Sequence, residues 1–185
     1  MQISTIVFAV VAVLVLWLVA VYNGLVRFRN RAREAFADIE VQLKRRFDLI
    51  PNLVETVKGY MEHEKEVLEK VTVARAGLMN AGSGLSERAK ADDMLTGALK
   101  TLFAVSENYP QLKANENFMK LQDELSDTEN KIQAARRFYN ANVRDLNTKI
   151  ETFPTTLIAG AFGFKAMEFF GVANEAERQP VAVKF

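Results

Sequence analysis

The N-terminal stretch of the chain is the feature that most limits how it can fold. The first 26 of the 185 residues carry no charged side chain, and Ile6 to Tyr22 read IVFAVVAVLVLWLVAVY without a strongly polar interruption. Because a helix rises about 1.5 Å per residue, this run and its flanks are long enough for the ~30 Å hydrocarbon core of a bilayer. The sequence therefore predicts a transmembrane helix over residues 6–25.

Four arginines follow this run at alternate positions, and they set its expected orientation. A cleaved signal peptide is the alternative to a retained transmembrane helix. Against it, residues 1–5 contain no Lys or Arg, and no A-x-A cleavage pattern occurs before Tyr22. The positive-inside rule keeps an arginine cluster in the cytoplasm. We therefore expect a single-pass membrane protein, with residues 1–5 as a short external N-terminus and the remaining chain in the cytoplasm. The expected membrane-interface residues are Trp17, Tyr22, Arg27, Arg29, Arg31 and Arg33.

Composition limits what the rest of the chain can be. Roughly 160 residues remain outside the predicted anchor, enough for one domain. The net charge of +1 and the lack of a basic stripe interleaved with aromatics argue against nucleic-acid binding. Seven basic and three acidic residues lie between Arg27 and Arg46, and such a cluster either attracts anionic lipid or only fixes topology. The absence of cysteine excludes disulfides, thiol catalysis and thiolate metal sites.

The residues after the anchor repeat with a helical period. Apolar or small residues recur every three or four positions from Leu25 to Leu78, with Glu64 as the one polar exception. Pro51 interrupts this seam, and because proline lacks an N–H and crowds the carbonyl of Phe47, we expect a kink or a short break near 49–52. The predicted seam is Leu25, Phe28, Ala32, Ala35, Ile39, Leu43, Phe47, Ile50, Val54, Val57, Met61, Leu68, Val71, Ala74 and Leu78.

Two further helices follow a Gly- and Ser-rich loop at 80–84. Ser86 is the expected N-cap of the first, which runs to Val105 and stops at Asn108-Tyr-Pro110. The second covers about 112–153, without an internal glycine or proline. Its seam is Phe118, Leu121, Leu125, Thr128, Ile132, Ala135, Tyr139, Val143, Leu146, Ile150 and Phe153.

These helical patterns define the expected fold class. No segment shows the alternation that marks strands. The sequence therefore predicts an all-α protein, in which the transmembrane helix continues into an elongated antiparallel bundle or coiled-coil hairpin. The cytoplasmic bundle is expected to cover 26–153.

The segment from 154 to 171 differs from the rest because it is short, apolar and rich in phenylalanine. It is predicted to be an apolar C-terminal helix, followed by a polar tail at 172–185. Two interpretations remain: the segment packs on the bundle or on a neighbouring subunit, or it lies in the membrane surface. The expected oligomer or lipid contacts are Ala159, Gly163, Phe162, Phe164, Phe169 and Phe170.

No arrangement of residues typical of catalysis is found. His63, the only histidine, is expected on a helix surface, since Glu62 and Glu64 do not share its face and no second histidine completes an HExxH motif. There is no G-x-S-x-G turn and no glycine-rich phosphate loop. The pairs Asp92/Asp93 and Glu124/Asp127 are expected on solvated helix faces. We therefore expect no enzyme, no cofactor and no bound metal.

Two polar runs on the longest predicted helix stand out, Glu129–Gln133 and Arg136–Asn140. One interpretation is a buried polar layer that fixes the register of the helices. The other is that these side chains simply face water. The sequence leaves both open.

Several longer motifs carry a family resemblance. They are Tyr22-Asn-Gly-Leu-Val-Arg-Phe-Arg-Asn-Arg31, the stretch from Ala37 to Tyr60, His63-Glu64, Val71-Thr-Val-Ala-Arg75, Tyr109-Pro-Gln-Leu-Lys-Ala-Asn-Glu-Asn-Phe118, Arg136-Arg-Phe-Tyr-Asn140, Asn147-Thr-Lys-Ile-Glu151 and Phe153-Pro154. From about residue 20 onward, the chain closely resembles the LemA family of bacterial membrane proteins. The resemblance implies one N-terminal membrane helix with a cytoplasmic helical bundle, and no catalytic or ligand residues.

The resemblance does not specify an activity, because the family has no agreed biochemical function. One branch, in magnetosome-forming bacteria, is implicated in making an intracellular membrane compartment, and other members are linked to the cell envelope. The leading hypothesis is a self-associating structural scaffold that organises or remodels the membrane, with the lipid bilayer and further copies of the chain as partners. The alternative is an adaptor for a membrane protease or an envelope-sensing system, with one membrane protein as its partner.

Overall fold

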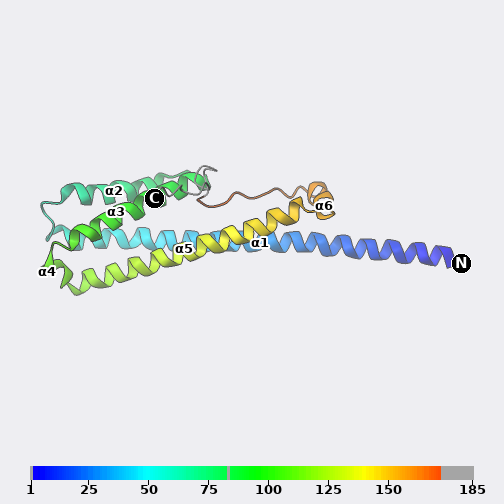
Figure 1. Cartoon of the computed structure of the whole chain (residues 1–185), viewed down its shortest axis with the longest axis horizontal. Helices are drawn as coiled ribbons and strands as arrows, with labels where there is room; N and C mark the ends of the chain where they lie inside the picture. Colours follow the sequence, from blue (N-terminus) through cyan, green and yellow to red (C-terminus); the bar gives the residue numbers. More distant parts are fainter. Residues whose placement is uncertain (1, 83, 172–185) are drawn as a thin grey trace, which may run out of the picture. The chain divides into compact units, whose positions relative to one another are not determined.

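All the regular secondary structure in the described part of the chain is helical. The computed structural model describes residues 2–82 and 84–171, and over these residues it contains six helices and no strand. The helices are α1 (Gln2–Lys58), α2 (Lys65–Asn80), α3 (Leu85–Ser106), α4 (Pro110–Lys113), α5 (Glu116–Glu151) and α6 (Thr155–Ala161) (Figure 1). The all-α prediction is confirmed. The predicted polar tail at 172–185 lies outside the described residues.

The chain divides into two compact units. The first unit consists of Met1–Ala37 and Arg137–Phe169, and the second consists of Asp38–Arg136 and Phe170–Phe185. The long helices α1 and α5 each contribute residues to both units. Each unit is described by itself below.

The hydrophobic core of the second unit is built from α1, α2, α3 and α5. Its largest cluster includes Leu53 and Val57 from α1, Val71 from α2, Leu99 from α3 and Leu125 from α5. The period of three and four residues explains this packing, because each helix presents one apolar stripe to its neighbours. On α5, the predicted seam is buried or half-buried from residue 118 to residue 150.

The buried face of α1 differs from the predicted seam at two positions. Arg46 and Leu53 are buried, whereas Phe47 and Val54, the residues predicted there, are only partly buried. The shift is a single position each time, because a helix face passes through 43, 46, 50, 53 and 57 as regularly as through 43, 47, 50, 54 and 57. The sequence pattern favoured Phe47 because it is apolar, but the protein buries the neighbouring arginine.

Helix α1 continues past Pro51 without the expected break. Proline leaves the carbonyl of Phe47 without an amide donor, and that carbonyl instead accepts a hydrogen bond from Arg75 Nε of α2 at 3.2 Å. The Arg75 guanidinium also lies 3.7 Å from the centre of the Phe47 ring. A side chain of a neighbouring helix therefore replaces the bond that proline removes.

The break in the seam occurs at 59–64. Helix α1 ends at Lys58, and the amides of Tyr60 and Met61 bond to the carbonyl of Val57 in the turn that follows. His63 is exposed in this connection, so its predicted position on a helix surface is wrong. The chain turns here because α2 must reverse direction for its apolar stripe to reach α1.

Other helix ends also differ from the predicted ones. Helix α3 begins at Leu85 after Gly84, so Ser86 lies inside the helix and does not cap it. Helix α5 is capped by Asn115, whose Oδ1 accepts the Phe118 amide at 3.1 Å. It ends at Glu151, and Phe153 beyond it is exposed.

Helix α6 is shorter than the predicted apolar helix over 154–171. It stops at Ala161 because Gly163 adopts a φ of +69°, the left-handed conformation that ends helices. The Phe164 amide bonds to the Ala159 carbonyl at 2.9 Å, and the Gly163 amide bonds to the Gly160 carbonyl at 3.2 Å. These two bonds form a Schellman cap, after which residues 164–169 are not helical.

The role of Arg75 predicts an energetic coupling with Pro51. Arg75→Met removes the donor that bonds to the Phe47 carbonyl, so we expect it to lower the free energy of unfolding by about 2 kcal/mol. In a Pro51→Ala background the loss is expected to be smaller, because alanine supplies a backbone amide that can bond to that carbonyl. Urea denaturation of the four proteins of this cycle measures the coupling.

The control for this cycle is Lys70→Met, which removes an exposed cation of α2 that pairs with Glu66. It is expected to change stability by less than about 0.5 kcal/mol. Equal losses from Arg75→Met in both backgrounds would refute the assignment.

Candidate functional site

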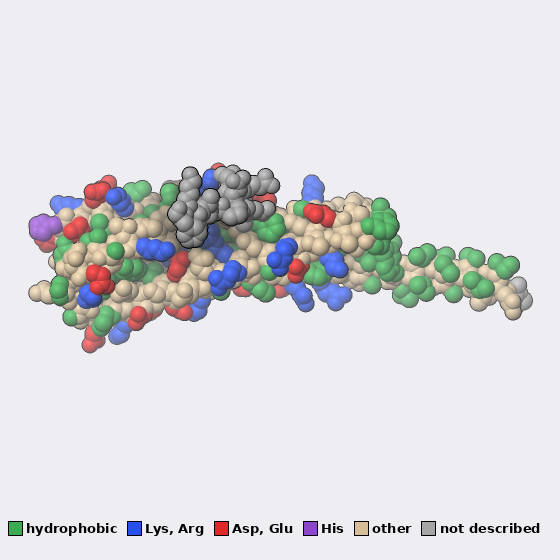
Figure 2. Space-filling view, viewed as in Figure 1, with side chains coloured by type: hydrophobic (Ala, Val, Ile, Leu, Met, Phe, Trp, Pro, Cys, Tyr) green, Lys and Arg blue, Asp and Glu red, His purple; other side chains and the backbone are tan. Residues whose placement is uncertain are grey.

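The N-terminal part of α1 has the properties of a membrane span. It contains a window with mean hydropathy 2.9 of which none is buried in the protein, and it is the one helix of the described residues that is long and apolar enough to cross a membrane. Figure 2 shows hydrophobic side chains along this part of the helix. The large apolar side chains from Ile6 to Val19 are thus exposed on the surface of this helix.

An aromatic cluster forms where this run ends. The Tyr22 ring centre lies 4.9 Å from that of Phe162 and 5.8 Å from that of Phe164. The Arg29 guanidinium carbon lies 5.2 Å from the Phe164 ring centre, a cation–π contact. The structure therefore brings together residues from two predicted sets, the membrane-interface residues and the C-terminal contact residues.

Beneath the aromatic cluster, α6 is fixed to α1 by a small apolar core. Leu25 of α1 is buried with Ile158 and Ala159 of α6, and Ile150 of α5 packs against them. Ala159, predicted to contact a subunit or lipid, is buried inside the protein. Gly163, also predicted to contact a subunit or lipid, provides the left-handed turn that ends α6.

Three large apolar side chains near α6 remain uncovered. Phe153 is 74% exposed, Leu157 is 65% exposed and Phe162 is 53% exposed. They belong to the same unit as the charge-free run. Because exposed apolar groups of this size cost free energy in water, they indicate a surface that contacts something less polar.

The other residues predicted to lie at the membrane interface or to contact lipid or a subunit are not part of the aromatic cluster. Trp17 is partly exposed on α1, Arg27 donates to the Asn23 carbonyl at 3.3 Å, and Arg31 and Arg33 are exposed. Phe169 is half-buried. Phe170 is only 2% exposed and packs in the second unit, 4.9 Å below the Arg136 guanidinium. Of the four phenylalanines predicted to contact lipid or another subunit, Phe170 is therefore covered by its own chain.

The segment that follows α6 is held to α5 by side chains. Asn147 Oδ1 accepts the Met167 amide, and Asn147 Nδ2 donates to the Met167 carbonyl, each at 2.9 Å. The Tyr139 hydroxyl donates to the Glu168 carbonyl at 2.8 Å. These bonds satisfy backbone groups of a segment that has no helix or sheet of its own. Asn147 and Tyr139, which both belong to the motifs that carry the family resemblance, thus have a structural role.

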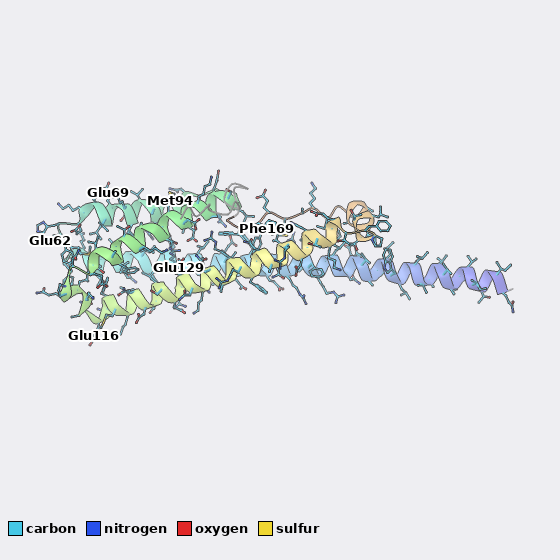
Figure 3. All side chains as sticks on the ribbon, in the orientation of Figure 1. Glu62, Glu69, Met94, Glu116, Glu129 and Phe169 are labelled. Carbon is cyan, nitrogen blue, oxygen red and sulfur yellow. The ribbon has the colours of Figure 1, made fainter. Side chains whose placement is uncertain are left out.

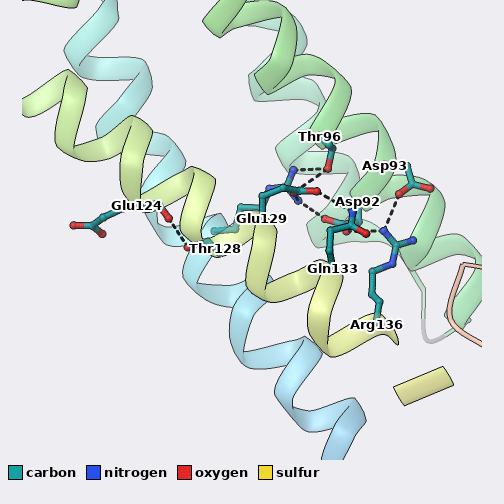
Figure 4. Close-up of polar contacts among 9 residues, drawn as sticks. Asp92, Asp93, Thr96, Glu124, Thr128, Glu129, Gln133 and Arg136 are labelled. Carbon is teal, nitrogen blue, oxygen red and sulfur yellow. Dashed lines mark hydrogen bonds and ion pairs between the residues drawn. The ribbon is translucent and has the colours of Figure 1, made fainter. Parts of the chain in front are cut away.

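The second unit contains a buried polar network around Arg46. Its Nη1 lies 2.8 Å from Asp92 Oδ1 of α3 and 2.9 Å from Glu129 Oε2 of α5, and its Nη2 donates to Thr96 Oγ1 at 2.6 Å (Figure 4). The side chains of Arg46 and Asp92 are 2% and 1% exposed. One guanidinium therefore joins three helices. Since Glu129 belongs to the first of the two polar runs, the interpretation as a buried polar layer holds for it.

Arg136 extends this network toward the end of the described chain. Its Nη1 lies 3.0 Å from Asp93 Oδ1 and 3.6 Å from Asp92 Oδ2. Its guanidinium also fills the space beside Gly171, where an added Cβ would lie 2.6 Å from Nη2. Gly171 has a φ of +78°, so glycine is needed there for both space and conformation.

Asp92 corrects the prediction that the Asp92/Asp93 pair is solvated. Asp93 is exposed, but Asp92 is buried, and its Oδ2 accepts no hydrogen bond within the described residues. Burial raises the pKa of Asp92 to about 6, while the Arg46 and Arg136 guanidiniums act in the opposite direction. The carboxylate is therefore still the main form at neutral pH.

Comparison with known proteins shows the family to which this chain belongs. The model of the LemA family matches residues 35–185. This chain belongs to the LemA family. Protein LemA of Metamycoplasma hominis is 32% identical over 86% of this chain and 72% of that protein.

The magnetosome protein MamQ of Magnetospirillum gryphiswaldense is 25% identical, and magnetosome protein MamQ 2 of Paramagnetospirillum magneticum is 26% identical. Each match covers 80% of this chain and 64% of the relative, so this LemA family member spans less than two thirds of the length of either magnetosome protein.

The described residues of this LemA family member contain no group of three His, Cys, Asp or Glu side chains that could hold a metal ion. Glu62, Glu69 and Glu116 point away from the bundle, whereas Glu129 lies among the helices (Figure 3). The buried carboxylates are already paired with arginines. The arrangement is suited to holding helices together and to contacting an apolar environment.

Sequence reasoning missed Arg46, the centre of the network. A signal was present, because Arg46 lies three residues after Leu43 and four before Ile50, on the buried face of the helix. A second signal was the matching position of Asp92, three residues before Leu95. A basic and an acidic residue at core positions of two predicted helices indicate a buried ion pair.

Removing the central arginine is expected to be strongly destabilising. Arg46→Met leaves the buried carboxylate of Asp92 and the half-buried carboxylate of Glu129 without their main partner, which costs about 3–5 kcal/mol of unfolding free energy. The matched control is Arg45→Met, the neighbouring residue, whose exposed pair with Glu124 at 3.7 Å contributes about 0–1 kcal/mol. Chemical denaturation followed by circular dichroism compares the two. Similar losses for both variants would contradict the role assigned to Arg46.

Proposed function

We propose that this protein is a membrane-anchored structural protein that self-associates and organises or remodels the bacterial membrane, without catalysis. The observation that supports this most directly is the aromatic cluster of Tyr22, Phe162 and Phe164. It lies where the charge-free run ends, and exposed apolar side chains surround it. A chain built in this way has two membrane-directed elements in one unit, the span itself and α6.

The position of α6 supports a location in the bilayer surface. Its inward residues Ile158 and Ala159 are buried against Leu25 of α1, so α6 is held at a fixed level along that helix. Its outward residue Leu157 is exposed, as are Phe153 and Phe162 on either side. Side chains of this kind insert among lipid head groups and acyl chains, where burial of their apolar area is favourable.

The four arginines after the span support a cytoplasmic location of the remaining chain. Under the positive-inside rule, Arg27 to Arg33 stay on the cytoplasmic side of the inner membrane, and the N-terminal end of α1 faces outward. Because the chain has no native cysteine, a Gln2→Cys variant tests this. A membrane-impermeant maleimide should label it in intact cells, and the absence of labelling would reverse the proposed orientation.

The part of the proposal that concerns membrane organisation is supported by family likeness. Two of the similar proteins are named magnetosome proteins. Self-association is supported by exposed apolar residues outside the α6 region, among them Val41 and Phe138. Such side chains on long helices are suited to contacts between copies of the same chain.

The second candidate function is an adaptor for a membrane protease or an envelope-sensing system. A groove between α2 and α3 in the second unit favours it. This groove has a volume of about 610 Å³, and its lining includes the apolar side chains of Val73 and Met94, both of which are largely exposed. Methionine-bearing grooves accept partner helices readily, because the side chain is flexible.

Contact between α6 and lipid is tested with a single fluorescent reporter. Trp17 is the only tryptophan, so Phe162→Trp in a Trp17→Phe background places one indole beside α6. In liposomes containing phosphatidylcholine brominated near the top of its acyl chains, we expect strong quenching of this indole. The matched control is Phe138→Trp in the same background, at an exposed position of α5, which should not be quenched. Equal emission from both variants with and without bromine would rule out the proposed location of α6.

The number of copies in the purified assembly, and the presence of a partner protein, distinguish the two candidate functions. Cryo-electron microscopy of the full chain, extracted with its native lipid, should show closed or extended assemblies if it is a scaffold. Isolated single copies together with one stoichiometric membrane protein would instead support the adaptor.

A further inference from the structure

A cavity lies between α1, the end of α5 and the start of α6. Its volume is about 260 Å³, close to the lower end of the range for ligand sites. Residues 20–28 of α1 form one side, and Lys149 and Thr155 form the other. All of these residues belong to the first unit.

The α1 side of the cavity is apolar and has room because of a glycine. Val21 and Phe28 line it, and between them a Cβ added to Gly24 would meet no atom within 4 Å. Glycine destabilises a helix interior relative to alanine, and here no close contact requires its small size. The missing side chain therefore leaves open space beside the helix.

The other side of the cavity is polar, and its charged and hydroxyl groups are available to a ligand. Lys149 is exposed and forms no ion pair with any of the described residues, and the Thr155 hydroxyl has no hydrogen-bond partner among them. The acidic residue one turn before Lys149 is Asp145, which pairs with Arg144 at 3.8 Å. A cation and a hydroxyl at the edge of an apolar cavity are suited to an anionic group that carries an apolar chain.

The position of the cavity along α1 indicates the source of such a ligand. Ala20 and Val21 belong to the charge-free run, whereas Arg27 begins the basic cluster, so the cavity straddles the end of the run. The first unit as a whole contains eight basic and four acidic side chains, which favours anions. In a chain anchored by this run, the cavity lies at the level of the lipid head groups.

We propose that this cavity binds one anionic membrane phospholipid. Lys149 and Thr155 contact its phosphate, and an acyl chain lies along Val21 and Gly24. This inference rests on the proposed membrane anchoring and adds to it a defined lipid site with a charge preference.

The test uses the full-length protein in nanodiscs made from equal amounts of phosphatidylglycerol and phosphatidylcholine with the same acyl chains. Native mass spectrometry after gentle release counts the lipids that each protein retains. We expect one retained phosphatidylglycerol on the unaltered protein. Gly24→Leu, which fills the cavity, and Lys149→Gln, which removes the cation, should each reduce its retention about tenfold.

Two matched controls separate the site from general effects. Gly97→Leu changes another helical glycine that has no atom within 4 Å of an added Cβ, and Arg144→Gln removes an exposed cation from the same helix as Lys149. Both should retain phosphatidylglycerol as the unaltered protein does. Circular dichroism of all variants verifies that they are folded.

The outcomes separate the inference from the proposed function. If the protein does not enter nanodiscs, the proposed anchoring fails. If it enters but retains both lipids equally, or if Gly24→Leu retains as much phosphatidylglycerol as Gly97→Leu, the lipid site is overturned while anchoring stands. Retention of a second copy of the chain in place of lipid also overturns it.

Discussion

The helices of the second unit depend on a single buried guanidinium. Arg46 contacts Asp92 of α3 and Glu129 of α5 from its position on α1, and all three groups would be costly to bury alone. One helix can slide along another by one turn without losing its apolar contacts, because one leucine can replace another. The same shift would separate Arg46 from the two carboxylates and the hydroxyl that it contacts. The network therefore fixes the axial positions of three helices whose apolar faces alone would leave them ambiguous.

The features that the sequence predicted are those governed by periodicity. The helical class, the long helix over the charge-free run and the seam of α5 from Phe118 to Ile150 follow from the composition and spacing of the residues, and the structure confirms them. The features that it did not predict have two different causes. Arg46 is buried because Asp92 and Glu129, which lie far from it in the chain, meet its guanidinium, so its position on the buried helix face became informative only together with that of Asp92. Helix α6 ends early because Gly163 adopts a left-handed conformation, a local event that the apolar composition of the segment obscured.

The family motifs have acquired physical roles in this structure, and these roles are structural. Asn147 and Tyr139 bond to the backbone of the segment after α6, and Arg136 packs on Phe170 while it pairs with Asp93. Asn115 caps α5, and its side-chain amide also donates to the Tyr60 hydroxyl. Motif residues of this kind preserve a shape.

The bond between Arg75 and the carbonyl of Phe47 has a consequence for how the chain is made. Residues leave the ribosome in order, so Pro51 emerges well before the arginine that compensates for it. Until α2 has been synthesised and has folded back, α1 contains an unpaired carbonyl at its weakest point and is free to bend there. The growing chain can therefore reorient around Pro51 until that arginine is in place. The long helix becomes continuous only when its neighbour arrives.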